Sequence, residues 1–149
     1  MKAAKIIKIG SDLLKKKKIT SHIIDSEILL SKILNKSREE ILTNLDQRIN
    51  RKNITIFRKF LKRRSQNEPI AYILGEKEFW SKKFDVNKNT LIPRPETELL
   101  VDKLTQIYKD RKIKILDIGT GSGCIIISLL SSLIKSTGIG IDISKEAIL

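Results

Sequence analysis

Apolar residues recur at helical spacing through the first half of the chain. Between residues 1 and 70, isoleucine, leucine and phenylalanine return every three or four positions, a pattern typical of amphipathic helices that bury one face. The three clearest apolar sets are Ala3, Ile6, Ile7, Leu13 and Leu14; Ile24, Ile28, Leu29, Ile33 and Leu34; and Ile54, Phe57 and Leu61. The pattern therefore predicts a small helical unit over residues 1–70.

Residues that suit helix ends lie between these apolar sets. Thr20 or Ser21 can cap the second helix. The sequence SREE at 37–40 predicts a capping box, in which the serine hydroxyl and the last glutamate carboxylate each bond the other residue's free amide. Arg63 and Arg64 are expected to end the last of these helices, where cations interact favourably with the helix dipole.

The pattern changes after Pro69. Between residues 72 and 89 the apolar residues are mostly aromatic or β-branched, which favours strands, and Ser81-Lys82-Lys83 predicts a hairpin turn between them. A proline-containing arm follows, and Pro95 is expected at the first position of a helix that reaches Tyr108. The residues that this helix is expected to bury are Leu99, Leu100, Leu104 and Ile107.

The last part of the chain predicts a strand, a turn, a helix and a second strand. The strands are expected over 113–118 and 138–143, the helix over 123–134, and a further helix capped by Ser144. The turn after the first strand is DIGTGSG, residues 117–123, whose three glycines are spaced G-x-G-x-G. Parallel strands joined through a helix form a βαβ unit, so the fold class is α/β.

The glycine turn has the composition of a turn that holds an adenosyl ligand. Small residues let the backbone approach such a ligand, and a carboxylate after the second strand bonds the ribose hydroxyls. Asp142, 19 residues after Gly123, occupies that place. The third glycine comes one position earlier than in the dinucleotide fingerprint G-x-G-x-x-G, which favours S-adenosylmethionine over a nicotinamide cofactor. Asp117 has two interpretations, a contact to the ligand's ammonium group or a bond that holds the turn.

Composition limits the classes of protein to consider. With 40% hydrophobic and 32% charged residues in 149, the chain can form a packed core. Its formal charge of +13 would attract an acidic partner such as nucleic acid, although a compositional excess of Lys, Ile and Asn is the preferred explanation. The run Lys15 to Lys18 has no aromatic neighbours for base stacking and is interpreted as a solvated helix end.

The scarcity of Cys and His argues against disulfide and metal chemistry. One cysteine and one histidine cannot supply a disulfide framework or a Cys-based zinc site, so no metal is expected. Cys124 is interpreted as a packing residue. The longest apolar segment, 124–134, is too short to cross a bilayer, and no signal peptide is evident, so we expect a cytoplasmic protein without a membrane partner.

Five segments together resemble the HemK/PrmC family, the protein-glutamine N5-methyltransferases that modify peptide-chain release factors. They occur in the family's order and at its spacing over essentially the whole chain. The segments are DSEILLSKIL (25–34), KSREEILT (36–43), EPIAYILGEKEFW (68–80), LIPRPETELLVD (91–102) and ILDIGTGSGCI (115–125).

The resemblance implies a domain organisation and a cofactor site. It implies a helical domain over 1–70 that helps to position a release factor, a β-hairpin linker over 71–92, and the start of a class I, Rossmann-like methyltransferase domain over 93–149. It also implies S-adenosylmethionine as cofactor and the side-chain amide nitrogen of a glutamine as methyl acceptor. By similarity, the cofactor-binding residues are Gly119, Thr120, Gly121, Ser122, Gly123 and Asp142.

The resemblance carries over no catalytic residue. Family members hold the glutamine amide with an N-P-P-Y motif after the fourth strand, whereas the prolines of this chain are Pro69, Pro93 and Pro95. We therefore expect an N-terminal fragment that is inactive alone and whose two-stranded cofactor half is loose. The alternatives are a non-catalytic module that docks a release factor, the N-terminal portion of a bifunctional protein and tRNA methyltransferase, and a basic nucleic-acid-binding protein.

Overall fold

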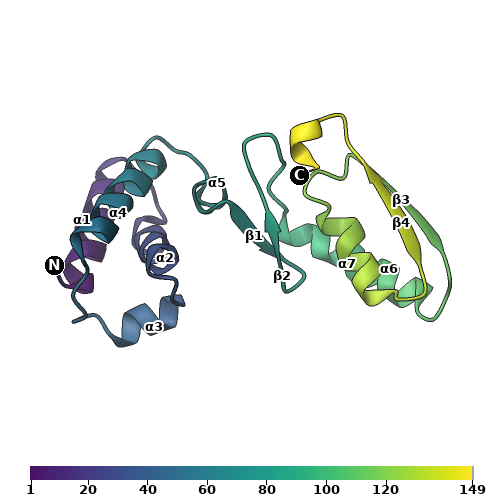
Figure 1. Cartoon of the computed structure of the whole chain (residues 1–149), viewed down its shortest axis with the longest axis horizontal. Coiled ribbons are helices and arrows are strands. Elements are labelled where there is room, and N and C mark those ends of the chain that lie inside the picture. The colour runs from purple at the N-terminus through teal and green to yellow at the C-terminus, as the bar shows by residue number, and fades with distance from the viewer. Residues whose placement is uncertain (149) are drawn as a thin grey trace. The chain divides into compact units, whose positions relative to one another are not determined.

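The computed structural model describes residues 1–148 and divides the chain into two compact units (Figure 1). The first unit comprises Met1–Leu74, and the second begins at Gly75. Each unit has its own cluster of buried apolar side chains. The described residues contain no helix that is both long enough and apolar enough to cross a bilayer.

The first unit is helical, as its periodicity predicts. Its described elements are α1 (Ala3–Lys16), α2 (His22–Leu34), α3 (Arg38–Thr43), α4 (Arg51–Ser65) and α5 (Ile70–Leu74). Helices α1, α2 and α4 pack against one another, and their apolar faces meet in a core that includes Leu14, Leu29, Leu30, Ile41 and Phe57. Gly10 of α1 allows the close approach of these helices, because a Cβ at this position would lie 2.8 Å from the ring of Phe57.

The predicted helix ends are confirmed in part. The capping box is present: Ser37 Oγ accepts a hydrogen bond from the Glu40 amide at 3.1 Å, and Glu40 Oε2 accepts one from the Ser37 amide at 2.6 Å. Ser21 precedes α2, yet its hydroxyl caps no amide. It donates instead to Asp25 Oδ2 at 2.8 Å, because that carboxylate lies one helical turn further on.

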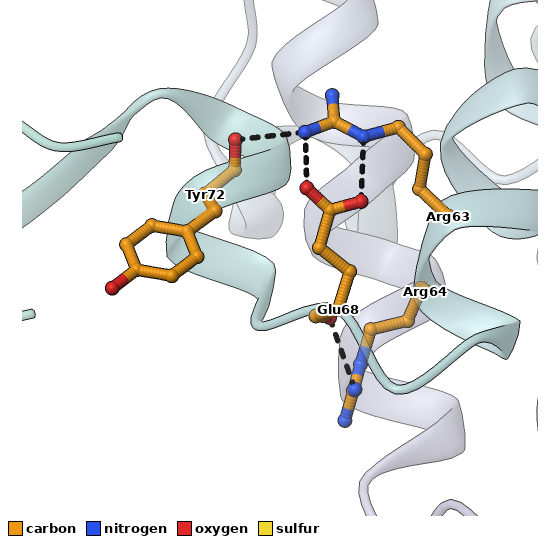
Figure 2. A network of polar contacts seen from close by, with 4 residues as sticks. All are labelled: Arg63, Arg64, Glu68 and Tyr72. Atoms are coloured by element: carbon orange, nitrogen blue, oxygen red, sulfur yellow. Dashed lines mark hydrogen bonds and ion pairs between the residues drawn. The ribbon is translucent and has the colours of Figure 1, made fainter. Parts of the chain in front are cut away.

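Arg63 and Arg64 lie in the last turn of α4, but they also make specific ion pairs. Arg64 Nε lies 2.6 Å from Asp25 Oδ2, and only 7% of that carboxylate side chain is exposed. Figure 2 shows the guanidinium of Arg63 bound to both carboxylate oxygens of Glu68 and to the carbonyl oxygen of Tyr72, with Arg64 bound to the Glu68 carbonyl. The network joins the end of α4 to α5.

Helix α5 corrects the prediction of strand from residue 72 onwards. Tyr72 and Ile73 are helical, and their amides donate to the carbonyl of Pro69 at 3.1 and 3.3 Å. Pro69 has no amide to leave unsatisfied, so it suits the residue that opens a helix. The proline therefore begins a short helix instead of separating helix from strand.

The second unit opens with a β-hairpin formed by β1 (Glu76–Phe79) and β2 (Lys82–Asp85). The turn residues are Trp80 and Ser81, since Phe79 pairs with Lys82. The prediction of a turn at 81–83 is therefore correct only at Ser81, because Lys82 and Lys83 belong to β2. Trp80 and Ser81 have φ angles of 51° and 56°, as a two-residue hairpin turn with left-handed residues requires. The Trp80 amide donates to Glu98 Oε1 at 2.9 Å, and its indole nitrogen donates to Ser132 Oγ at 3.3 Å.

The helix expected to begin at Pro95 is confirmed, with a 3-10 turn over Pro95–Thr97 followed by α6 (Glu98–Tyr108). The prediction of its buried face is wrong for three of four residues. Leu99, Leu100 and Ile107 are 68%, 46% and 57% exposed, and Leu104 is half-buried. Val101 is fully buried and belongs with Leu104 to the cluster that contains the hairpin residues Phe79 and Phe84, so a different face of α6 supports the core.

The βαβ unit is confirmed and consists of β3 (Lys114–Ile118), α7 (Cys124–Ser132) and β4 (Thr137–Ile141). The strands are parallel and Asp117 pairs with Gly140. The helix expected after Ser144 is a single 3-10 turn over Lys145–Ala147 in the described residues. The fold class is α/β, with a helical unit followed by the start of a Rossmann-like unit.

Candidate binding site at the glycine turn

The turn between β3 and α7 depends on glycine at three positions. Gly119, Gly121 and Gly123 have φ angles of 78°, 54° and 74°, in the left-handed region that other residues rarely adopt. The amides of Gly119 and Thr120 both donate to the carbonyl of Ile141, at 2.8 and 3.0 Å. The turn therefore crosses from the end of β3 to the end of β4.

Glycines in β4 allow the turn and α7 to lie close to the sheet. A Cβ at Gly140 would lie 2.7 Å from Thr120 Oγ1, and one at Gly138 would lie 2.8 Å from Ile126 Cδ1. Thr120 can therefore cover position 140 only because this position has no side chain. The alternation of glycine with isoleucine in TGIGI thus serves the turn as well as the strand.

Asp142 lies at the glycine turn, as the sequence pattern predicts. Its Oδ2 accepts a hydrogen bond from the Gly121 amide at 2.8 Å, and its Oδ1 accepts one from the Ser144 amide at 2.9 Å. These amide donors favour the ionised form and lower the pKa of the Asp142 carboxyl, with the bond from Ser144 the largest cause. The site therefore has a fixed negative charge beside the turn.

Asp117 holds the turn. Its Oδ2 accepts a hydrogen bond from Thr120 Oγ1 at 2.8 Å. This contact supports the structural interpretation of Asp117.

Cys124, at the first position of α7, is buried, and burial raises the pKa of its thiol. Its environment fits the expected packing role and not that of a nucleophile.

A cavity of about 250 Å³ lies along the turn. Four of the six predicted cofactor-binding residues line it, namely Thr120, Gly121, Ser122 and Gly123, together with Ile126, Ile127, Gly140, Ala147 and Ile148. Gly119 and Asp142 adjoin these residues through the backbone and side-chain bonds described above. Ser122 Oγ is buried and makes no hydrogen bond to oxygen or nitrogen within residues 1–148. Its hydroxyl can therefore form a hydrogen bond with a polar group of a ligand.

The segment from Asn87 to Thr90 is a part of the site that the sequence patterns missed. Thr90 is 3% exposed, and its γ-methyl group would lie 3.7 Å from a Cβ placed on Gly121. Asn87 Nδ2 donates to the carbonyl of Glu146 at 3.1 Å, and Asn87 Oδ1 accepts from the Asn89 amide at 2.8 Å. The signal in the sequence was the polar cluster NKNT, which is typical of an Asx turn.

Comparisons with known proteins show which proteins the chain resembles. The sequence model of the PrmC N-terminal domain family matches residues 5–75. The chain is 42% identical over 146 residues to the release factor glutamine methyltransferase of Leptospira interrogans. The aligned region covers 96% of the chain and 51% of that protein. It is 41% identical to the protein of the same name from Haemophilus influenzae, over 93% of the chain and 52% of that protein.

A second group of relatives is longer. The bifunctional methyltransferase of Rickettsia conorii is 40% identical over 96% of the chain and 32% of its own length. The chain thus spans about half the length of the release factor glutamine methyltransferases that it matches, and about a third of the bifunctional relative.

Proposed function

This chain belongs to the HemK/PrmC family, and from that premise we propose that it supplies the S-adenosylmethionine-binding turn of a methyltransferase. The proposed acceptor is the side-chain amide nitrogen of a glutamine in a peptide-chain release factor. The observation that carries the proposal is the Asp142 carboxylate held 2.8 Å from the Gly121 amide, beside a turn of three left-handed glycines.

The residues of the turn fit an adenosyl cofactor. Gly119, Gly121 and Gly123 leave the backbone free to approach a ligand, because no side chain projects from these positions. Asp142 is suited to accept hydrogen bonds from a ribose diol, and doing so would require its carboxylate to share the lone pairs now used by backbone amides. The buried hydroxyl of Ser122 offers one more polar group toward the cavity.

The two units are proposed to have different roles in methyl transfer. When bound, the cofactor supplies an electrophilic methyl group on a sulfonium. Methyl transfer is an in-line displacement, so the protein must above all fix the two reacting atoms about 3 Å apart. The glycine turn and Asp142 can hold the donor side of that geometry. The helical unit, whose sequence matches the PrmC N-terminal domain, is proposed to help position the release factor.

A second candidate is favoured by the similarity to the bifunctional methyltransferase of Rickettsia conorii. In that case the same turn would serve as the N-terminal methyltransferase site of a protein with two such activities. The two candidates share the cofactor and differ in the number of acceptors.

Cofactor binding by the full chain tests the proposal. Isothermal titration calorimetry with S-adenosylhomocysteine is expected to show saturable binding, weakened at least about tenfold by Asp142→Asn, since a charged acceptor of a hydroxyl pair is worth more than about 1.4 kcal/mol. Asp102→Asn is the matched control. Within residues 1–148, the one hydrogen bond of the Asp102 carboxylate is accepted from the side chain of Gln106, which also lies on α6. Absence of binding to a chain whose second unit is folded, as judged by the emission of Trp80, would refute the proposed cofactor.

A further inference from the structure

Helix α4 has a charge pattern that neither the glycine turn nor the family resemblance explains. Residues 51–65 contain seven Lys and Arg residues and no Asp or Glu. Arg63 and Arg64 are held in ion pairs with Glu68 and Asp25. The other five are exposed and take part in no ion pair within the described residues; they are Arg51, Lys52, Arg58, Lys59 and Lys62, which we call the α4 stripe.

The α4 stripe lies on one side of the helix because the opposite side is buried. Phe57 and Leu61 are 2% and 3% exposed in the helical core. The stripe residues follow spacings of three, four and seven, which place side chains on a common face. From the first to the last stripe residue the helix rises by about 16 Å, at about 1.5 Å per residue.

The excess of positive charge is concentrated in the helical unit. Residues 1–74 contain 18 Lys and Arg against seven Asp and Glu, a net charge of +11, whereas residues 75–149 contain 12 against 10, a net charge of +2. A compositional bias would raise the basic content of both units alike. This distribution therefore argues against the compositional explanation that the sequence patterns favoured.

Ion pairing within the helical unit leaves the α4 stripe exposed and unpaired among the described ion pairs, as it does the exposed run Lys15 to Lys18. Of the seven acidic residues, four pair with a basic residue: Asp25, Glu27, Asp46 and Glu68. The basic partners in these pairs are Lys2, Arg38, Arg63 and Arg64, all of them outside the stripe. The positive potential of the stripe is thus not neutralised by neighbouring carboxylates among the described ion pairs.

The composition of the stripe selects the chemistry of a partner. Protein–protein interfaces have an apolar or aromatic centre and are depleted in lysine. The remaining exposed residue of α4 is Thr55, so the stripe offers no such centre. Rows of Lys and Arg without aromatic residues are typical of surfaces that contact phosphates and read no bases. We propose that the α4 stripe binds the phosphodiester backbone of a nucleic acid, without recognition of base sequence.

Fluorescence anisotropy with the full chain and a labelled RNA duplex of about 20 base pairs tests the proposal, with a DNA duplex of the same sequence as second probe. The triple variant R58Q/K59Q/K62Q is expected to bind both duplexes at least about tenfold more weakly, and its slope of log K against log salt should be smaller by about 2 to 3. Glutamine keeps a helix propensity close to that of Lys and Arg, so the fold should persist.

The matched control is K103Q/K109Q/K112Q, which removes the same charge from exposed positions of the second unit. The affinity of this control variant for both duplexes should stay within about twofold of that of the parent chain. Equal losses in both triple variants would overturn the assignment to α4, because net charge alone would then explain binding. Should the first triple variant unfold in circular dichroism, R51Q/K52Q takes its place.

Two further results would overturn the choice of partner. If poly-glutamate displaces the labelled duplex as well as unlabelled RNA does at equal charge, the α4 stripe would be assigned to an acidic protein partner. A preference of more than about tenfold between duplexes of different sequence would contradict backbone binding, since phosphate contacts carry no sequence information.

Discussion

Asp142 accepts a hydrogen bond from the backbone amide of Gly121, 21 residues earlier in the chain, at 2.8 Å. This bond joins the end of β4 to the middle of the glycine turn. It means that the carboxylate proposed to bind a ribose is already oriented by the turn. It also links one of the contacts that hold the turn to the ionisation of the Asp142 side chain.

The first prediction concerns pH. Backbone amides lower the pKa of Asp142 below its ordinary value of 3.8. A carboxyl whose pKa is depressed by folding stabilises the folded state above the unfolded pKa, and this contribution is lost as pH falls through the folded pKa. We expect the NMR shift of the Gly121 amide to titrate with a midpoint below 3.8, and Asp142→Asn to abolish that titration. A midpoint at or above 3.8 would contradict the prediction.

The second prediction concerns Gly140. An alanine there would place Cβ 2.7 Å from Thr120 Oγ1, so Gly140→Ala should destabilise the second unit by about 1–3 kcal/mol, as overpacking does. Urea denaturation measures the free energy of unfolding. The double variant with Thr120→Ala should recover part of the loss, because the clashing hydroxyl is removed. Equal stability of the parent and Gly140→Ala would refute this account of the turn.

The third prediction separates two adjacent arginines. Arg64→Ala leaves the buried carboxylate of Asp25 without its ion-pair partner, which should cost about 3–5 kcal/mol. Arg63→Ala breaks an ion pair whose side chains are 42% and 33% exposed, so its expected cost is about 1 kcal/mol. Chemical denaturation followed by far-UV circular dichroism compares the two. The reverse order of stabilities would show that burial does not decide the strength of these pairs.

The fourth prediction concerns the contact between Gly10 and Ser26. Ser26 is fully buried and its hydroxyl has no hydrogen-bond partner in the part of the chain that the structure describes. Ser26→Ala should therefore be neutral or stabilising by up to about 1 kcal/mol. Gly10→Ala should cost about 1–3 kcal/mol, because its Cβ would meet both Ser26 and Phe57. Thermal melts of the variants, singly and combined, measure these effects.

Features that depend on residues close together in the chain were predictable from the sequence. The capping box at 37–40 and the start of the helix at Pro95 were found because each depends on residues within one turn of helix. The βαβ unit was found because its glycine turn has a fixed spacing, although β3 starts one residue later and β4 ends two residues earlier than expected.

The errors in prediction arose where contacts between distant parts of the chain determine which residues are buried. Leu99 and Leu100 have the same hydrophobicity as the buried residues of the core, and only the packing of α6 against α7 and the hairpin selects Val101 instead. Thr90 lies 31 residues before Gly121 in the chain, so no local pattern could place it at the turn. The charge of α4 was visible in the sequence, but its concentration on a solvent-facing side required knowledge of which side is buried.

The contacts of Trp80 make the two units spectroscopically separable. It is the single tryptophan of the chain, and its amide and indole nitrogens bond Glu98 and Ser132, both in the second unit. Intrinsic emission therefore monitors the unit that contains the glycine turn, while the far-UV signal is dominated by the helical unit. Loss of ellipticity and change of emission, recorded on one sample, would report whether the two parts unfold together or in separate steps.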